Sequence, residues 1–315
     1  RYSMASFRQQ YRITILLHQM IPGIEPFNYK EQCRMKKTLE QAALLAVLLV
    51  LAGCAGNEPA EPKWEEHLYR TVVYNSGEDE SDAKYLEIAQ RSQKLLSLLE
   101  EKTGAFVMDA YNYQTMDDEG TPLYTMNTPE VPIEIAPAGM SIQVSREYFK
   151  WNPIETEDGL ELEKQLVLDD LTLNLLVPNQ YRDMEQEILA AWRKYFYFEK
   201  VEAENNYNEM AGKEERLDIT EDQLTVNIIF VKDGQRYFTY RSDCASADGS
   251  WITDPLVQIY TGNIHCNYAH SFLTQWTYIP SEAGSPEKAY EEIAPYILEC
   301  GAQESLKEVR PLRNQ

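Results

Sequence analysis

The spacing of apolar residues in the first part of the chain predicts a strand, a long helix and a second strand. Leu68 to Asn75 is a short run rich in β-branched and aromatic residues, which is typical of a strand. From Asp82 to Lys102 the apolar residues recur near helical spacing, with Ser81 before the run and Gly104 after it as start and stop signals. Ala105 to Tyr113 then predicts the next strand.

The middle of the chain alternates between a broken stretch and apolar runs. Prolines recur through residues 122–137, so we expect a loop there. Met140 to Ser145 predicts a strand and Tyr148 to Ile154 another, followed by a turn at Asp158-Gly159. Leu171 to Val177 is an almost continuous apolar run that ends at a proline, which is typical of a buried strand.

The last part of the chain predicts a helix, a hairpin and further strands. Tyr181 to Tyr195 places its apolar residues on one helical face. Leu224 to Val231 alternates as a strand, Asp233-Gly234 is the strongest hairpin signal in the chain, and Arg236 to Arg241 would be the returning strand. The remaining predicted elements are strands at Leu256 to Thr261 and Ser271 to Tyr278 and a helix at Pro286 to Cys300.

This order of elements predicts an α+β domain. We expect a mixed sheet with helices packed on one face, an arrangement that could contain two similar strand–helix–strand halves. The domain is placed at residues 67–280, with the C-terminal helix and a polar tail at residues 281–315.

A secretory signal pattern precedes the domain. Lys36 and Lys37 stand before an uninterrupted apolar run, Ala42 to Ala52, which is far shorter than the ~20 residues that span a bilayer. The run leads into Leu51-Ala52-Gly53-Cys54. This tetrapeptide resembles the lipobox of bacterial lipoproteins, in which the cysteine takes a diacylglyceryl group and becomes the new N-terminus. We therefore expect lipidation of Cys54 and anchoring on the extracytoplasmic face of the bacterial membrane; the competing interpretation is a buried helix with an ordinary core cysteine.

The rest of the N-terminal region divides around this signal. Met35 puts two lysines directly before the apolar run, so residues 35–53 are predicted to be the signal peptide and residues 1–34 upstream translation or a long n-region. Residues 54–66 contain prolines among Glu, Ala and Asn. This composition cannot bury a core, so it predicts a tether.

The negative charge of the chain argues against binding partners that are themselves negatively charged. The net charge is −22, and 48 acidic against 22 basic residues follow Cys54. Such a surface repels nucleic acid and also repels anionic lipid headgroups. We therefore expect no nucleic-acid partner, and contact with membrane lipid only through an acylated Cys54.

Residue patterns of common catalytic and metal sites are missing from the sequence. It contains no GxGxxG, GxxxxGK[ST], HExxH or GxSxG. His265, Cys266 and His270 offer three ligands where a structural zinc site uses four, so a polar loop between two strands is favoured. His67 has no evident partner for acid–base work, and Glu100-Glu101 is typical of an exposed helix end. We expect no enzyme activity, no metal and no cofactor.

Cysteines and aromatic residues supply two further predictions. Cys244, Cys266 and Cys300 allow at most one disulfide, and Cys244 with Cys266 is favoured because each lies beside a predicted strand end. Aromatic residues could form a binding platform, because Tyr and Trp supply rigid contact area; core packing is the alternative. The candidate binding patch consists of Trp192, Tyr195, Tyr197, Tyr237 and Tyr240.

Several blocks of the sequence together resemble one family. The blocks are SIQVSREYFKWNPI (Ser141 to Ile154), LTLNLLVPNQYRDMEQEI (Leu171 to Ile188), YFYFEKVEAENNYN (Tyr195 to Asn208), LTVNIIFVKDGQRYFTY (Leu224 to Tyr240) and DPLVQIYTGNI (Asp254 to Ile264). They look like the extracytoplasmic domain of bacteriocin-associated integral membrane proteins, which are permease-like proteins related in architecture to MacB-type ABC transporters. The resemblance implies a fold like the periplasmic domain of MacB and carries no catalytic residues with it.

The resemblance and the lipobox together suggest a function. We expect a lipid-anchored, non-enzymatic extracytoplasmic domain that binds a peptide or an ABC transporter component, in bacteriocin export or immunity. Permeases of this family hold membrane helices before and after the domain, whereas this chain has a lipobox in front and no apolar span behind. One alternative is therefore a truncated piece of a permease. Another is a secreted cell-surface enzyme, such as a cell-wall hydrolase, which would need a cleft with two carboxylates of perturbed pKa.

Overall fold

The computed structural model describes residues 67–73, 80–117, 119–244, 249–303 and 305–312. All of them belong to a compact unit that spans Trp64–Gln315. The predicted upstream segment, the signal peptide, Cys54 and the whole of the predicted tether lie outside the described residues.

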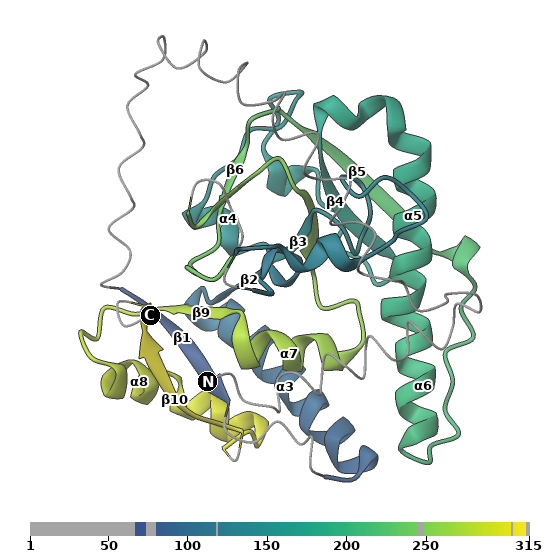
Figure 1. Ribbon diagram of the computed structural model, residues 1–315. Helices are drawn as coiled ribbons and strands as arrows, with labels where there is room; N and C mark the ends of the chain where they lie inside the picture. Colours follow the sequence, from purple (N-terminus) through teal and green to yellow (C-terminus); the bar gives the residue numbers. More distant parts are fainter. Residues whose placement is uncertain (1–66, 74–79, 118, 245–248, 304, 313–315) are drawn as a thin grey trace, which may run out of the picture. The chain divides into compact units, whose positions relative to one another are not determined.

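A mixed sheet of eight strands forms the centre of this unit (Figure 1). Its order is β10-β1-β9-β2-β3-β8-β4-β5, with parallel pairing only in β3/β8 and β4/β5. The strands are β1 (Leu68–Val73), β2 (Phe106–Asp109), β3 (Ser141–Ser145), β4 (Thr172–Pro178), β5 (Thr225–Val231), β8 (Leu256–Tyr260), β9 (Thr277–Pro280) and β10 (Leu306–Pro311). A separate ribbon pairs β6 (Arg236–Phe238) with β7 (Trp251–Thr253).

Helices complete the α+β architecture, which confirms the predicted fold class. The helix α3 packs against α7 and α8, α7 packs against β1, and α5 packs against β5. The α-helices are α3 (Asp82–Thr103), α4 (Tyr148–Trp151), α5 (Glu185–Tyr197), α6 (Ala203–Met210), α7 (Cys266–Gln275) and α8 (Pro286–Cys300), and a π-helix, η7 (Phe198–Glu202), joins α5 to α6. Short 3₁₀ helices are η3 (Tyr111–Tyr113), η4 (Leu123–Met126), η5 (Leu162–Lys164), η6 (Asn179–Met184) and η8 (Glu221–Gln223). Within the described part of the chain, no helix has both the length and the apolar character needed to cross a membrane.

The capping residues in the sequence predicted the bounds of α3 and α8 correctly. The Ser81 side chain accepts a hydrogen bond from the Lys84 amide at the start of α3, and Gly104 ends the helix at φ 71°. Glycine adopts this left-handed conformation without the steric cost that other residues meet. In α8, Ser285 caps the helix and Gly301 ends it in the same conformation. Both predicted helices are therefore confirmed to within a residue.

The predicted strand at Ser271 to Tyr278 is wrong over most of its length. Residues up to Gln275 belong to α7, and only β9 at Thr277–Pro280 is a strand. The buried Tyr268, Ala269, Phe272 and Leu273 follow helical spacing, but polar residues between them hide this pattern in the sequence. Their burial against α3 and β1 stabilises the helix.

The predicted strand at Tyr148 to Ile154 is also wrong, because its first turn is the helix α4. The fully buried Tyr148 packs edge to face on Phe106, with ring centroids 5.9 Å apart. This packing overrides the β-propensity of the aromatic residues.

The Asp233-Gly234 turn exists, but the predicted hairpin does not. Gly234 has φ 81°, yet β6 pairs with β7 and not with β5. The Asp254 carboxylate accepts hydrogen bonds of 2.9 Å from the Gly234 and Gln235 amides. These bonds direct the chain away from the edge of β5.

The predicted polar tail contains a strand. Leu306 and Val309 are buried, and β10 pairs antiparallel with β1. The charged residues that alternate with them lie at the edge of the sheet, where charges discourage pairing with other chains.

Candidate functional site

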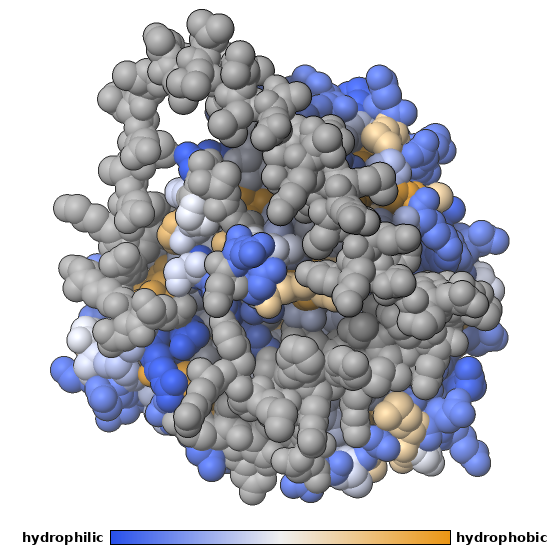
Figure 2. Space-filling view, viewed as in Figure 1, coloured by the Kyte–Doolittle hydropathy of each residue, from blue (hydrophilic) through white to orange (hydrophobic). Residues whose placement is uncertain are grey.

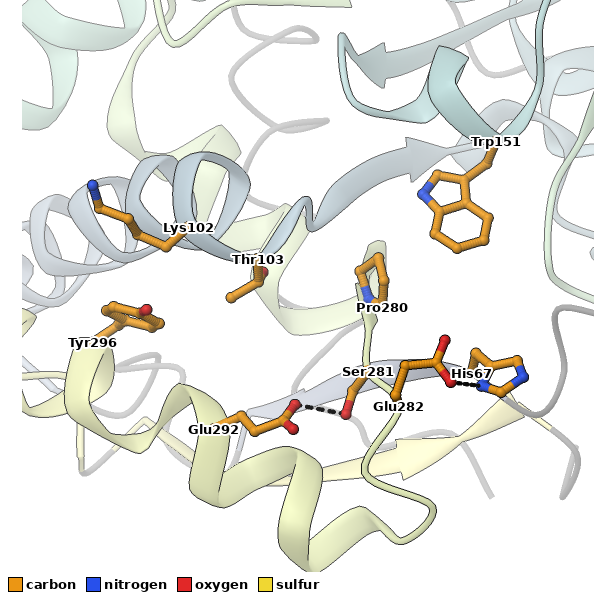
Figure 3. Close-up of a pocket in the computed structure, with 9 residues that line it drawn as sticks. All are labelled: His67, Lys102, Thr103, Trp151, Pro280, Ser281, Glu282, Glu292 and Tyr296. Carbon is orange, nitrogen blue, oxygen red and sulfur yellow. Dashed lines mark hydrogen bonds and ion pairs between the residues drawn. The ribbon is translucent and has the colours of Figure 1, made fainter.

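An open hollow of about 510 Å³ lies where the start of β1, the end of α3, the end of β9 and α8 meet. Figure 3 shows Trp151 and Tyr296 on different sides of this space, with Glu282 and Glu292 along its lower edge. Its volume falls in the range of small-ligand pockets, roughly 300–1,000 Å³. The hollow is therefore the candidate binding site of the domain.

Hydrogen bonds fix the polar edge of the hollow. The Ser281 hydroxyl donates to Glu292 Oε2 at 2.7 Å, and the Ser281 amide donates to the His67 carbonyl at 2.8 Å. His67 Nδ1 lies 3.0 Å from Glu282 Oε2. The prediction that His67 lacks a partner is therefore wrong. Sequence reasoning missed this pairing because the two residues meet only through the pairing of β1 with β9.

The chemistry of the hollow suits binding more than catalysis. Aromatic faces attract apolar and cationic groups, and the carboxylates of Glu282 and Glu292 accept hydrogen bonds from donors. Lys102 also lines the space, but its ammonium pairs with Glu101. A ligand with an apolar part and a positive or donor group would match this lining.

A second polar cluster lies inside the molecule, on three neighbouring strands. Asp109 on β2, Gln143 on β3 and Gln258 on β8 are register partners, so their side chains share one face of the sheet. Glu199 faces them from the π-helix η7 and is fully buried. Its two carboxylate oxygens accept hydrogen bonds from the Gln143 and Gln258 amides, at 2.8 and 2.6 Å.

Burial changes the protonation of this cluster. Burial raises the pKa of Glu199 to about 7, although hydrogen bonds from Gln258, Gln143 and Tyr195 oppose the shift, and the nearby Asp109 raises it further. Burial also raises the pKa of Asp109 to about 7, against a hydrogen bond from the Tyr111 amide. The partners that hydrogen-bond Glu199 are all neutral, so they offset only part of the lost solvation of its charged form.

A third carboxyl departs from its sequence prediction. Glu100, predicted at an exposed helix end, is only partly exposed. Burial raises the pKa of Glu100 to about 7, although a hydrogen bond with Ser145 opposes the shift. Glu100 extends the interior polar groups along β3, because Ser145 lies two residues beyond Gln143 on the same strand face.

The predicted aromatic binding patch is wrong for three of its five members. Trp192, Tyr237 and Tyr240 are buried in the core, because their rings fill the space between elements. Trp192 donates through Nε1 to the Ile135 carbonyl at 2.9 Å, and the Tyr240 hydroxyl accepts from Asn152 at 2.7 Å. Tyr195 and Tyr197 are half-buried on α5.

The histidine and cysteine run is not a loop between strands, as predicted, but the start of a buried helix. His265 caps α7 by accepting from the Asn267 amide, and its ring stacks on Tyr207 with centroids 4.7 Å apart. His270 Nδ1 lies 2.8 Å from the Ser92 hydroxyl. In the described residues no group of three or more His, Cys, Asp or Glu side chains could hold a metal ion.

The favoured disulfide is also wrong, since Cys244, Cys266 and Cys300 are all free thiols. Cys266 lies in the first turn of α7 with its sulfur 3.6 Å from His265 Nε2. The backbone of Cys244 pairs with that of Gln114 in an isolated antiparallel β-bridge. Burial raises the pKa of Cys244 and of Cys266 to about 12, which keeps both thiols protonated and unreactive.

Comparisons with protein-family models, curated proteins and solved structures returned no match to this chain. The family resemblance therefore stays a prediction.

Proposed function

We propose that this chain is a lipid-anchored extracytoplasmic domain, related to the ectodomains of bacteriocin-associated ABC permeases, that binds a peptide or a transporter component. A role in bacteriocin export or immunity belongs to the same proposal. The anchor is Cys54, acylated after cleavage of the signal that ends in Leu51-Ala52-Gly53. A lipid on this cysteine would hold the folded unit at the membrane through a short tether.

The observation that carries the binding role is the hollow in Figure 3. It combines Trp151 and Tyr296 with two carboxylates in an open space of ligand size. His67 in its lining follows Cys54 closely in the sequence. A partner bound there would be held near the membrane that carries the anchor.

The secreted-enzyme alternative finds part of what it requires. Burial raises the pKa values of Asp109 and Glu199 to about 7, and the nearby Asp109 raises the pKa of Glu199 further. However, Glu199 is fully buried, and neither carboxyl lines the hollow in Figure 3. Since Glu199 has no exposed surface, binding at the hollow is favoured over hydrolysis at this pair.

Fractionation of a bacterial host tests the anchor. In the membrane fraction, the wild-type chain should begin at an acylated Cys54 by mass, and Cys54→Ala should leave that fraction. Cys33→Ala is the matched control, because this cysteine precedes the signal. The proposal fails if Cys54→Ala remains in the membrane fraction with an uncleaved N-terminus.

Substitutions in the hollow test the binding role. Chemical cross-linking in the same cells should capture a peptide or a membrane protein on the wild-type chain, and Trp151→Ala with Tyr296→Ala should lose it. Equal capture by wild type and variant would exclude the hollow as the contact.

A further inference from the structure

Exposed apolar side chains concentrate in one segment that precedes β4. Leu160, Val167, Leu168 and Leu171 are 60%, 38%, 57% and 38% exposed. On the face of the molecule drawn in Figure 2, hydrophilic residues dominate the described surface and apolar residues form small patches. A cluster of exposed large apolar residues marks an interaction surface more often than isolated ones do.

Hydrogen bonds to the sheet hold this segment in place. At its start, the Glu157 amide donates to the Phe230 carbonyl at 2.8 Å and the Lys232 amide donates to the Glu155 carbonyl at 3.0 Å. These bonds attach residues 155–157 to the outer edge of β5.

Two asparagines fix the other end. Asn174, fully buried on β4, donates to the Val167 carbonyl at 2.8 Å and accepts from the Val167 amide at 2.9 Å. Asn227 on β5 donates to the Gln165 carbonyl at 2.9 Å. The segment therefore presents its leucines on a fixed backbone, which lowers the entropic cost of binding a partner.

Acidic side chains outnumber basic ones in and beside this segment. Four of its seven carboxylates form ion pairs, Glu155 with Lys232, Glu161 with Lys164, Glu163 with Arg146 and Asp170 with Lys200, so seven negative charges face four positive ones. Lys164 is the one basic residue between positions 155 and 171. The acidic residues of the segment are Glu155, Glu157, Asp158, Glu161, Glu163, Asp169 and Asp170. A further hollow of about 310 Å³ adjoins Leu168, Asp169 and Asp170 at the carboxyl ends of β3 and β8. We call this segment, with its exposed apolar side chains and the acidic side chains among them, the 155–171 face.

We infer that the 155–171 face binds a cationic amphipathic peptide segment. Leucine side chains would contact the apolar side of the peptide, and the excess of acidic side chains would attract its lysines and arginines. Charge disfavours other occupants: a second copy of this chain, with net charge −22, would bring acidic side chains together, and an anionic lipid surface would repel the face. This site is separate from the hollow in Figure 3 and does not depend on lipidation of Cys54.

Peptide binding to the detergent-solubilised full chain tests the inference. The probe is a synthetic amphipathic helix of lysine and leucine, and its counterpart carries glutamate in place of every lysine. Wild type should bind the lysine peptide and not the glutamate peptide. Leu160→Ser with Leu168→Ser should weaken binding by about tenfold or more, which corresponds to about 1.4 kcal/mol, because both substitutions remove apolar area from the contact.

Matched control variants distinguish peptide binding at the 155–171 face from nonspecific binding elsewhere on the surface. Leu298→Ser removes a leucine that is 66% exposed on α8 and should leave the affinity unchanged. Glu157→Gln with Glu161→Gln should weaken binding and lessen its dependence on salt, whereas Glu291→Gln with Glu299→Gln on α8 should do neither. Circular dichroism of each variant checks folding.

Three outcomes would overturn the inference. They are the absence of lysine-peptide binding by wild type, equal weakening by Leu298→Ser, and a wild-type dimer that Leu160→Ser with Leu168→Ser dissociates. None of them bears on the lipid anchor, which the fractionation of Cys54→Ala tests by itself.

Discussion

The interior cluster around Glu199 and the 155–171 face reverse the usual placement of side chains, in opposite directions. Glu199 is a carboxyl with no exposed surface, whereas Leu160 and Leu168 are aliphatic side chains more than half exposed. Charged groups are rarely buried without a partner, and single exposed leucines are common. The two cases differ in which groups offset the unfavourable placement: other residues of the fold for Glu199, and a binding partner for the leucines.

Hydrogen bonds from neighbouring side chains offset part of the cost of burying the Glu199 carboxyl. Gln143 and Gln258 direct amide donors at its two oxygens, and the Gln143 amide also donates to Gln258 Oε1 at 2.7 Å. Since Gln143 and Gln258 occupy paired positions on parallel strands, Glu199 fastens η7 to the β3/β8 pair. The exposed leucines have no such compensation inside the described part of the chain, which is why we assign them to a partner.

Removing the Glu199 carboxyl should give the largest effect. Glu199→Ala leaves the amide donors of Gln143 and Gln258 without their acceptor in a buried place, at a cost of about 1–3 kcal/mol for each. Urea unfolding should therefore show a loss of about 3 kcal/mol or more in the free energy of unfolding.

Glu199→Gln is the matched control for this loss, because it keeps the volume and one acceptor oxygen and should cost about 1 kcal/mol. If Glu199→Ala unfolds at the same urea concentration as wild type, the cluster does not hold the helix layer to the sheet.

The pH dependence of stability should give the next largest effect. In the folded state Glu199 keeps its proton up to a pKa of about 7, whereas the ordinary pKa of a glutamate is 4.5. Between these values the folded chain binds more protons than the unfolded chain, so stability falls as pH rises, by up to about 1.4 kcal/mol per pH unit. The contribution is complete below pH 4.5 and lost above pH 7.

Comparing wild type with Glu199→Gln isolates this contribution from other carboxyls. The free energies of unfolding of the two proteins, measured at several pH values from 5 to 7.5, should diverge, with wild type losing more stability toward high pH. Asp109 is the nearby acidic group that also raises the pKa of Glu199. Parallel pH profiles would mean that Glu199 is ionised at neutral pH.

Elements with local signals could be predicted from the sequence. The start and end of α3 follow from Ser81 and Gly104, and the continuous apolar run of β4 follows from burial of every residue in that strand. By contrast, α7 was missed because His265, Asn267 and His270 make its sequence look like a polar loop, although all three are buried.

Neither the burial of Glu199 nor the exposure of the leucines could be predicted from the sequence. Glu199 is buried by Gln143 and Gln258, which are far away in the chain and meet it only through the strand register. Leu168 and Leu171 stand next to the apolar run of β4, which enters the core. Their residue type and position in the sequence therefore do not distinguish them from buried leucines. Pairing between distant segments, which no local pattern encodes, decides both cases.

The smallest expected effect is the change in the free energy of unfolding when a leucine of the 155–171 face is replaced. Leu160→Ser should change the free energy of unfolding by less than about 0.5 kcal/mol, because a side chain that is 60% exposed loses little contact in the folded state. Leu173→Ala, which truncates a buried leucine on β4, should instead cost about 2–5 kcal/mol. Urea unfolding of both variants under one condition makes this measurement. A loss of more than 1 kcal/mol in Leu160→Ser would show that the fold itself uses this leucine. In that case its exposure would no longer point to a binding partner, and the contrast with Glu199 would disappear.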